Sequence, residues 1–361
     1  MDHGLVTVDD ALTKLALFGA VLPRAVAATR ASKTPGLREL GETATDELFI
    51  AISALYREAP DLEAVRNAVE DCRAAAPELA GLGVAGALVA PPPVVELGLR
   101  TCRVARTSYE HLELESAPVL PDSLTAYAGT QVSHVRMLRH PEPRPWVVWV
   151  HGAEQGRVDD LFAFRARHLH EGLGLNVALP VLPQHGPRRD AGKAWPGFDL
   201  LGNVATMVRA VSDVRAALAW IGEPVTLVGM SLGGPVAALT SAIDPAVQGV
   251  VAMVPMLDAH ATIAHHVART GGRGRELAGL LRDDAVTACG SVVDPLALDP
   301  HAPPDRRLVV AARNDRMASV RAAERLHERW GGQVHWHPGG HIGHLMSGDV
   351  RRVVDDFLSR G

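Results

Sequence analysis

Gly229-Met230-Ser231-Leu232-Gly233 is the stretch that decides the fold class of this chain. An apolar run at 225–228 precedes it, and small and apolar residues at 234–239 follow it. This order predicts a strand, a sharp turn and a helix, with Ser231 at the tip of the turn. The flanking glycines leave room for close backbone packing, so we expect the serine hydroxyl to be accessible. We expect the backbone N–H of Leu232 to point toward an oxyanion that forms beside this hydroxyl.

Two further groups follow in chain order. An apolar run at 308–312 predicts a buried strand, and Asp315 lies in the turn after it. A second predicted strand, at 333–337, leads into a Gly-Gly turn that presents His341. Serine is a poor nucleophile without a base, histidine can take its proton, and a carboxylate can fix the histidine tautomer. The order therefore predicts nucleophilic catalysis by Ser231, with His341 as the base and Asp315 as the acid.

The sequence offers a second candidate for the acid and a second candidate for the base. Asp258 follows the strand that is expected after the elbow helix, but Asp315 has the tighter turn, so we prefer Asp315. His344 lies close behind His341, but His341 directly follows the Gly-Gly turn, so we prefer His341. These choices are predictions about which side chains face Ser231.

A histidine cluster near the end of the chain raises the possibility of a metal site. His335 and His337 alternate along one predicted strand, and His341 and His344 follow beyond a turn. No cysteine or carboxylate joins these histidines at metal-ligand spacing. We therefore expect neither a metal nor an organic cofactor.

With these motifs the chain resembles the α/β-hydrolase superfamily, over roughly residues 108–361. The resemblance includes Trp149-Val150-His151-Gly152, which follows an apolar run at 146–150. In that superfamily such a turn supplies a second N–H to the oxyanion hole, which implies that Ala153 assists Leu232. The resemblance also implies the following substrate-binding or pocket-wall residues: His151, Gly152, Glu154, Gln155, Met230 and His185.

The order of the predicted elements gives the organisation. Residues 1–107 look mostly helical and hold no candidate set of nucleophile, base and acid, so we expect them to pack on a catalytic domain at 108–361. That domain begins with two strands that are expected to be antiparallel. From residue 146 onward strands and helices alternate, which predicts an α/β fold with a mostly parallel sheet and helices on both faces. Helical pieces at 258–306 interrupt the alternation and are expected to form a cap above Ser231.

Composition agrees with a soluble enzyme. The 361 residues are 47% hydrophobic and 21% charged, and the formal net charge of −5 argues against nucleic acid as the main partner. The three widely spaced cysteines make no disulfide framework, so a reducing cytoplasm is the expected location. We see no secretory signal and no transmembrane segment, so any membrane contact would be peripheral. The oligomeric state stays open.

These observations predict a serine hydrolase that cleaves a small-molecule carboxylic ester or related acyl compound through an acyl-enzyme. An acyltransferase or a thioesterase would use the same parts, and fold alone does not choose among them. The alternative from another class is a non-catalytic binding protein with the same fold. Such proteins usually lack one of the three catalytic residue types, and all three are present here.

Overall fold

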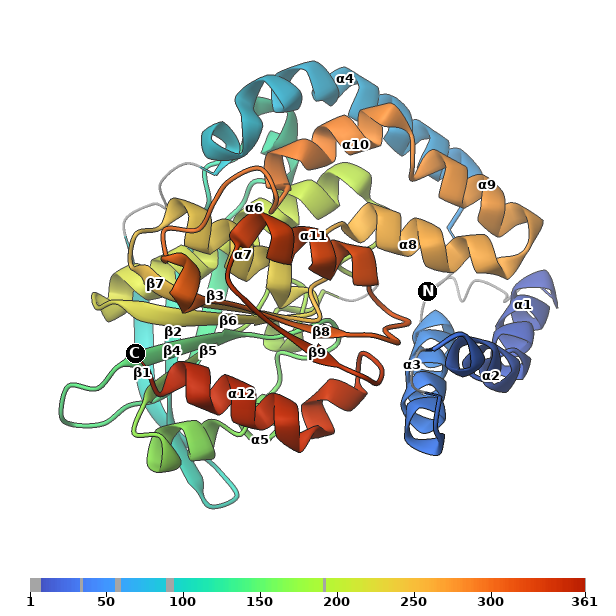
Figure 1. The fold of residues 1–361 in the computed structure, drawn as a ribbon. Helices are drawn as coiled ribbons and strands as arrows, with labels where there is room; N and C mark the ends of the chain where they lie inside the picture. Colours follow the sequence, from blue (N-terminus) through green and yellow to red (C-terminus); the bar gives the residue numbers. More distant parts are fainter. Residues whose placement is uncertain (1–7, 33–34, 56–59, 89–93, 191–192, 361) are drawn as a thin grey trace.

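A nine-stranded sheet forms the centre of the computed structural model, which describes residues 8–32, 35–55, 60–88, 94–190 and 193–360 (Figure 1). The strands are β1 (Glu96–Val104), β2 (Thr107–Ser116), β3 (Gln131–Leu138), β4 (Trp146–Val150), β5 (Asn176–Pro180), β6 (Val225–Met230), β7 (Val247–Met253), β8 (Arg307–Ala312) and β9 (Gln333–His337). Their spatial order is β1-β2-β3-β5-β4-β6-β7-β8-β9. The first four strands in this order pair antiparallel, and the pairs from β5 to β9 are parallel. The mostly parallel sheet is therefore confirmed.

Helices cover both faces of the sheet, as predicted. The helices of the described residues are α1 (Val8–Gly19), α2 (Val21–Ala31), α3 (Leu37–Leu55), α4 (Leu62–Ala87), α5 (Asp160–Ala163), α6 (Leu200–Ile221), α7 (Gly233–Ile243), α8 (Ala259–Val267), α9 (Gly272–Leu280), α10 (Asp284–Gly290), α11 (Val320–Trp330) and α12 (Gly348–Leu358). Helices α6, α7 and α11 lie on one face, and α5 and α12 lie on the other (Figure 1). Every residue of β4, β5 and β6 is buried between these layers, which explains their continuous apolar runs.

The sheet begins earlier than the boundary that we placed at residue 108. Strand β1 pairs with β2 through register partners such as Leu99 and Leu112. Because β1 is an edge strand, its own residues are mostly exposed or half-buried, and Leu97 and Leu99 are exposed. Its sequence therefore lacks the buried pattern that reveals an inner strand. The described residues before β1 form the helices α1 to α4, in line with the expected helical region.

The segment at 258–306, which we expected to form a cap, packs against α4 and α6. Its helices α8, α9 and α10 join α4 and the start of α6 in a separate apolar cluster, in which Ile263, Ala278 and Val286 meet Val69 and Leu79. These helices thus add a further layer over α6 (Figure 1). The apolar side of α4 supplies the surface that they need to bury, which explains why they are held there.

The first three helices lie beside the ends of β8 and β9 (Figure 1). The amide of Asn314, in the loop after β8, donates to the Ser32 hydroxyl at 3.1 Å. In the same loop, the backbone N–H of Arg316 donates to Asp46 of α3 at 3.3 Å. The helices therefore contact the loops where the predicted acid and base reside. Among the described helices, none combines the length and apolar character that crossing a bilayer requires.

Candidate active site

Ser231 lies at the sharp turn between β6 and α7, as the sequence predicts. Its φ is +52°, a conformation that non-glycine residues rarely adopt and that costs free energy. A Cβ atom at Gly229 would overlap the carbonyl oxygen of Gly233, and one at Gly233 would overlap that of Val150. The two glycines are therefore needed for the close approach of β6, α7 and β4. The result is a half-buried serine whose strained backbone is held by its surroundings.

The structure brings together the three residues that the sequence singles out. The imidazole Nε2 of His341 lies 3.0 Å from Oγ of Ser231, and its Nδ1 lies 2.8 Å from Oδ2 of Asp315. In the tautomer that satisfies both contacts, Nδ1–H donates to the carboxylate and Nε2 accepts the serine proton. This arrangement can deprotonate the serine hydroxyl as it attacks.

The carboxylate of Asp315 is itself fixed by its own loop. Its Oδ1 accepts the backbone N–H groups of Met317 at 2.8 Å and Ala318 at 2.7 Å, which leaves Oδ2 for His341. The rival acid, Asp258, is instead the N-cap of α8 and accepts the N–H of Ala261 at 2.9 Å. The preference for Asp315 agrees with this geometry.

The two candidate bases have different surroundings. Burial disfavours the charged form of His341, but the charge and hydrogen bond of Asp315 outweigh it, so the pKa of His341 is raised. His344 is also buried, and its Nδ1–H donates to the backbone carbonyl of His341. Burial and the nearby His341 lower the pKa of His344 to about 3, so it stays neutral. His344 thus supports the loop, whereas His341 faces Ser231.

The turn after β4 lies directly against Ser231. A Cβ atom at Gly152 would stand 3.2 Å from the Cβ of Ser231. The N–H of Gly152 donates to the side-chain oxygen of Gln155 at 2.7 Å, and Nε2 of His151 accepts the N–H of Leu182 at 3.0 Å. These contacts fix the backbone that leads to Ala153, beside the serine.

Most of the residues expected to bind substrate have other contacts. His151 and His185 are buried and bond the carbonyls of Gly152 and Pro183 through Nδ1, at 2.7 and 2.9 Å. Met230 is buried, and Gln155 is engaged by Gly152 as described above. The side chain of Glu154, by contrast, lines a large cavity next to this turn. Direct substrate contact by the other residues stays a prediction.

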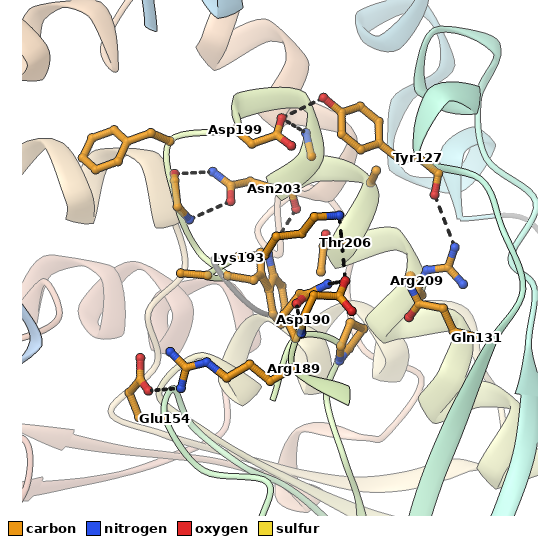
Figure 2. Close-up of a pocket in the computed structure, with 18 of the residues that line it drawn as sticks. Tyr127, Gln131, Glu154, Arg189, Asp190, Lys193, Asp199, Asn203, Thr206 and Arg209 are labelled. Carbon is orange, nitrogen blue, oxygen red and sulfur yellow. Dashed lines mark hydrogen bonds and ion pairs between the residues drawn. The ribbon is translucent and has the colours of Figure 1, made fainter. Parts of the chain in front are cut away.

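The cavity has a volume of about 1410 Å³ and is shown in Figure 2. Its apolar wall includes Phe49 and Ile52 of α3 and Trp195 of the loop before α6. Its charged rim includes Arg189, which pairs with Glu154 at 3.0 Å (Figure 2). Residues of α3, of the loops before β3, after β4 and after β5, and of α6 line it, and none comes from 258–306. Helix α3 thus lines the cavity, and the cap above Ser231 stays a prediction.

Two carboxylates of α3 contact the loop that carries His341, and the sequence analysis missed them. Asp46 is fully buried, and its Oδ2 accepts the N–H of His341 at 2.6 Å. Glu42 accepts the N–H of Gly340 at 3.0 Å and contacts Nε2 of His337 at 2.7 Å. No local signal reveals these contacts, because acidic residues on a helix usually face solvent.

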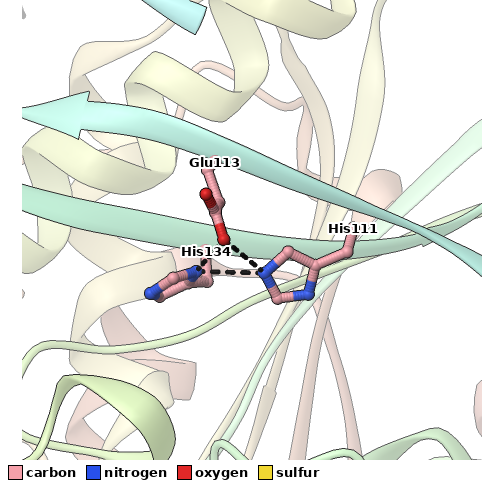
Figure 3. A group of neighbouring side chains, drawn as sticks. All are labelled: His111, Glu113 and His134. Atoms are coloured by element: carbon pink, nitrogen blue, oxygen red, sulfur yellow. Dashed lines mark hydrogen bonds and ion pairs between the residues drawn. The ribbon is translucent and has the colours of Figure 1, made fainter. Parts of the chain in front are cut away.

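One group of side chains in the described part of the chain has metal-ligand character, on β2 and β3 (Figure 3). Nε2 of His111 lies 3.0 Å from Nδ1 of His134, and Oε1 of Glu113 lies 3.4 and 3.6 Å from these atoms. The same oxygen also pairs with the Arg100 guanidinium at 3.0 Å. Because the arginine already neutralises this carboxylate, we interpret the group as a hydrogen-bonded cluster of the sheet.

A family described as "Serine hydrolase" matches residues 205–349, which include Ser231, Asp315 and His341. The uncharacterized protein Rv2627c of Mycobacterium tuberculosis H37Rv is 35% identical over 292 residues, which cover 76% of this chain and 70% of that protein.

Two similar structures are acetyl xylan esterases. Acetyl xylan esterase 1 from Thermoanaerobacterium sp. JW/SL YS485 has a TM-score of 0.56 at 14% identity, covering 84% of this chain and 99% of that one. The enzyme from Paenibacillus sp. R4 has a TM-score of 0.53 at 12% identity, covering 84% of this chain and 97% of that one. At such identities the similarity concerns the fold alone.

Proposed function

The chain belongs to the α/β-hydrolase superfamily, and we propose that it is a serine hydrolase that cleaves carboxylic esters. One observation carries the proposal: His341 lies between Ser231 Oγ, at 3.0 Å, and Asp315 Oδ2, at 2.8 Å. A base in contact with a strained, half-buried serine and oriented by a fixed carboxylate is the arrangement that acyl transfer to serine requires.

The proposed reaction has two stages. Ser231 Oγ attacks the acyl carbon while its proton passes to Nε2 of His341, and the carbonyl oxygen becomes an oxyanion. The imidazolium then gives its proton to the leaving alcohol, which departs and leaves an acyl-serine ester. A water molecule attacks that ester with His341 again as the base, and the acid is released with Ser231 restored.

Backbone groups beside Ser231 are suited to stabilise the oxyanion. We assign this role to the N–H groups of Leu232, at the start of α7, and Ala153, in the turn after β4. Both lie on backbone that is fixed by close packing, so the donors need little reorganisation during the reaction. The loss of one such donor typically costs about 10²–10³-fold in kcat.

The neighbouring cavity is the proposed site for the bulk of the substrate. Apolar side chains such as Phe49 and Phe198 suit a hydrocarbon portion, and the charged rim at Arg189 and Lys193 suits a polar portion. Charged side chains at the rim attract water, so we expect water to reach the site, which favours hydrolysis over transfer to another alcohol. We therefore propose an amphipathic, small-molecule acyl ester as the substrate class.

A fluorophosphonate probe tests the proposal directly, because it reacts with a serine that an adjacent base activates. The expected result is stoichiometric labelling, with peptide mapping to Ser231 and parallel loss of p-nitrophenyl ester hydrolysis. A folded protein that resists the probe and hydrolyses no short-chain ester would overturn the proposal.

A further inference from the structure

We propose that Asp46 of helix α3 is a positioning residue of the active site, which holds the His341 loop and supplies a second negative charge beside the imidazole. The proposal rests on the proposed function, because it assigns Asp46 an effect on the base of that reaction. It also gives the N-terminal helical region a role in the chemistry.

The contacts of Asp46 are directed at the backbone of the His341 loop. Oδ2 accepts the N–H of His341 at 2.6 Å, and Oδ1 accepts the N–H of Ile342 at 2.9 Å. Oδ2 also lies 3.3 Å from the backbone N of Arg316, next to Asp315. A single carboxylate therefore bridges the two loops that carry the predicted acid and base. Carboxylate hydrogen bonds to backbone N–H groups are short and strong, so they restrict both loops.

Glu42, one helical turn earlier, extends this connection. Its Oε2 accepts the N–H of Gly340 and contacts Nε2 of His337. A Cβ atom at Gly339 or Gly343 would overlap the Glu42 carboxylate, and one at Gly340 would crowd that of Asp46. The glycines around His341 thus make room for the α3 carboxylates. The small residues of the His341 loop are therefore matched to the carboxylates of α3 that pack against them.

The burial of Asp46 disfavours its charged form, which is a cost to folding at neutral pH. Burial raises its pKa to about 6, although His341 and the two N–H donors favour the carboxylate. The negative charge of Asp46 in turn raises the pKa of His341, after the larger effect of Asp315. Asp46 therefore stabilises the imidazolium that forms when His341 takes the serine proton. Residues that destabilise the fold but assist the chemistry are common in active sites.

Other titratable or charged groups also face this region. They are Glu42 and Glu47 of α3, His337, His344, Asp315, Arg316, and Arg269 after α8. Glu47 provides a matched comparison with Asp46. It is the next residue of the helix, it is equally buried, and it pairs with the side chains of Arg316 and Arg269. Its carboxylate is not bonded to the backbone of the His341 loop.

The same helix also lines the cavity. Phe49, Ile52 and Ser53 follow Asp46 by one to two turns and form part of the cavity wall. A substrate that contacts these residues would also contact the helix that positions His341. This explains why the positioning carboxylates reside on α3 and not on the His341 loop itself.

The experiment compares Asp46→Asn with Glu47→Gln in the full-length protein, by the pH dependence of kcat/KM for p-nitrophenyl acetate. Asparagine keeps the size of the side chain but removes the charge and one acceptor. We expect kcat/KM at pH 8 to fall by roughly 10- to 100-fold, because small displacements of a base have effects of this size. We also expect the acidic limb of the profile to move to lower pH. Glu47→Gln should leave the acidic limb where it is.

A second readout does not depend on turnover. The His341 imidazole signals, identified by their loss in His341→Gln, are titrated by NMR in the wild type and in Asp46→Asn, and the variant should titrate at lower pH. Glu42→Gln, a milder change at a less buried site, should lower kcat without moving the limb. An Asp46→Asn protein with the wild-type kcat/KM and limb would overturn the inference. Absence of fluorophosphonate labelling in the wild type would instead overturn the proposed function, and the NMR titration would still test Asp46.

Discussion

Oγ of Ser231 and Nε2 of His341 lie 3.0 Å apart, although 110 positions separate the two residues in the chain. The serine is held at φ +52° by the elbow, and the histidine is held by carboxylates from two different elements. Such a pair can exchange a proton without prior rearrangement of the side chains.

Replacement of the nucleophile tests this pair most simply. Ser231→Ala should reduce hydrolysis of p-nitrophenyl acetate by about 10³-fold or more, because the acyl-enzyme can no longer form. The circular dichroism spectrum and melting temperature should stay close to those of the wild type. A folded Ser231→Ala protein that retains most of its activity would show that another group performs the attack.

The two histidines of the loop should behave differently. His341→Ala should match Ser231→Ala, and the double variant should be no worse than either, because the residues act as a unit. His344→Gln should cost less than about 10-fold in kcat/KM, since His344 only bonds the carbonyl of His341. Its main effect should be a lower unfolding midpoint in urea. Equal loss of activity in both variants, without loss of stability in His344→Gln, would contradict our choice of base.

The two candidate acids give a second matched pair. Asp315→Asn should lower kcat by about 10³–10⁴-fold, because an amide leaves His341 in the wrong tautomer. Asp258→Asn should leave kcat almost unchanged, because asparagine caps a helix about as well as aspartate does. Steady-state kinetics on the two purified variants decide the matter, and the reverse ranking would show that Asp258 is the acid.

Activity should also decline at acidic pH, because His341 must be neutral to accept the serine proton. Its pKa is raised above the ordinary value of 6.5, chiefly because Asp315 outweighs the effect of burial. The acidic limb of kcat/KM should therefore lie above the pH at which a free imidazole titrates. A profile from pH 5 to pH 9 measures this limb. A limb at or below the ordinary imidazole value would mean that the two carboxylates do not act on His341 as inferred.

The central sheet and the three predicted active-site residues could be predicted because each carries a local signal. The apolar runs of β6 and β8 mark strands that are buried on both faces, and Ser231 and Asp315 follow them directly. The turn at His341 is marked by its glycines. Residues at the carboxyl ends of parallel strands meet at one edge, so chain order alone indicates which side chains come together.

The remaining features depend on contacts that leave no local trace. Asp46 lies 295 positions before His341, and a helical acid that binds a distant backbone looks like one that faces water. Strand β1 was not predicted, because an edge strand with exposed leucines has no pattern of buried residues. The position of 258–306 depends on the apolar side of α4, whose partner cannot be read from its own sequence.

The buried charge of Asp46 also predicts how folding stability varies with pH. The pKa of Asp46 rises from 3.8 to about 6 in the folded protein, so folding favours its protonated form. Well below pH 3.8 the carboxyl is protonated in both states and costs nothing. As pH rises from 3.8 to about 6, the carboxyl ionises in the unfolded state but stays protonated in the folded state, so stability falls by up to roughly 3 kcal/mol from this group and levels off above pH 6.

Asp46→Asn should remove that dependence, because asparagine resembles the protonated carboxyl in size and charge. Urea unfolding is measured at pH 4, 5, 6 and 7. As pH rises, the free energy of unfolding of the variant should increase relative to that of the wild type, by up to roughly 3 kcal/mol. Ser231→Ala keeps Asp46 and should follow the wild-type curve. Parallel curves for Asp46→Asn and the wild type would show that the carboxylate is not destabilised by burial. Paired with lower activity, a relative gain in stability at neutral pH would mark Asp46 as a residue that serves the reaction at the expense of the fold.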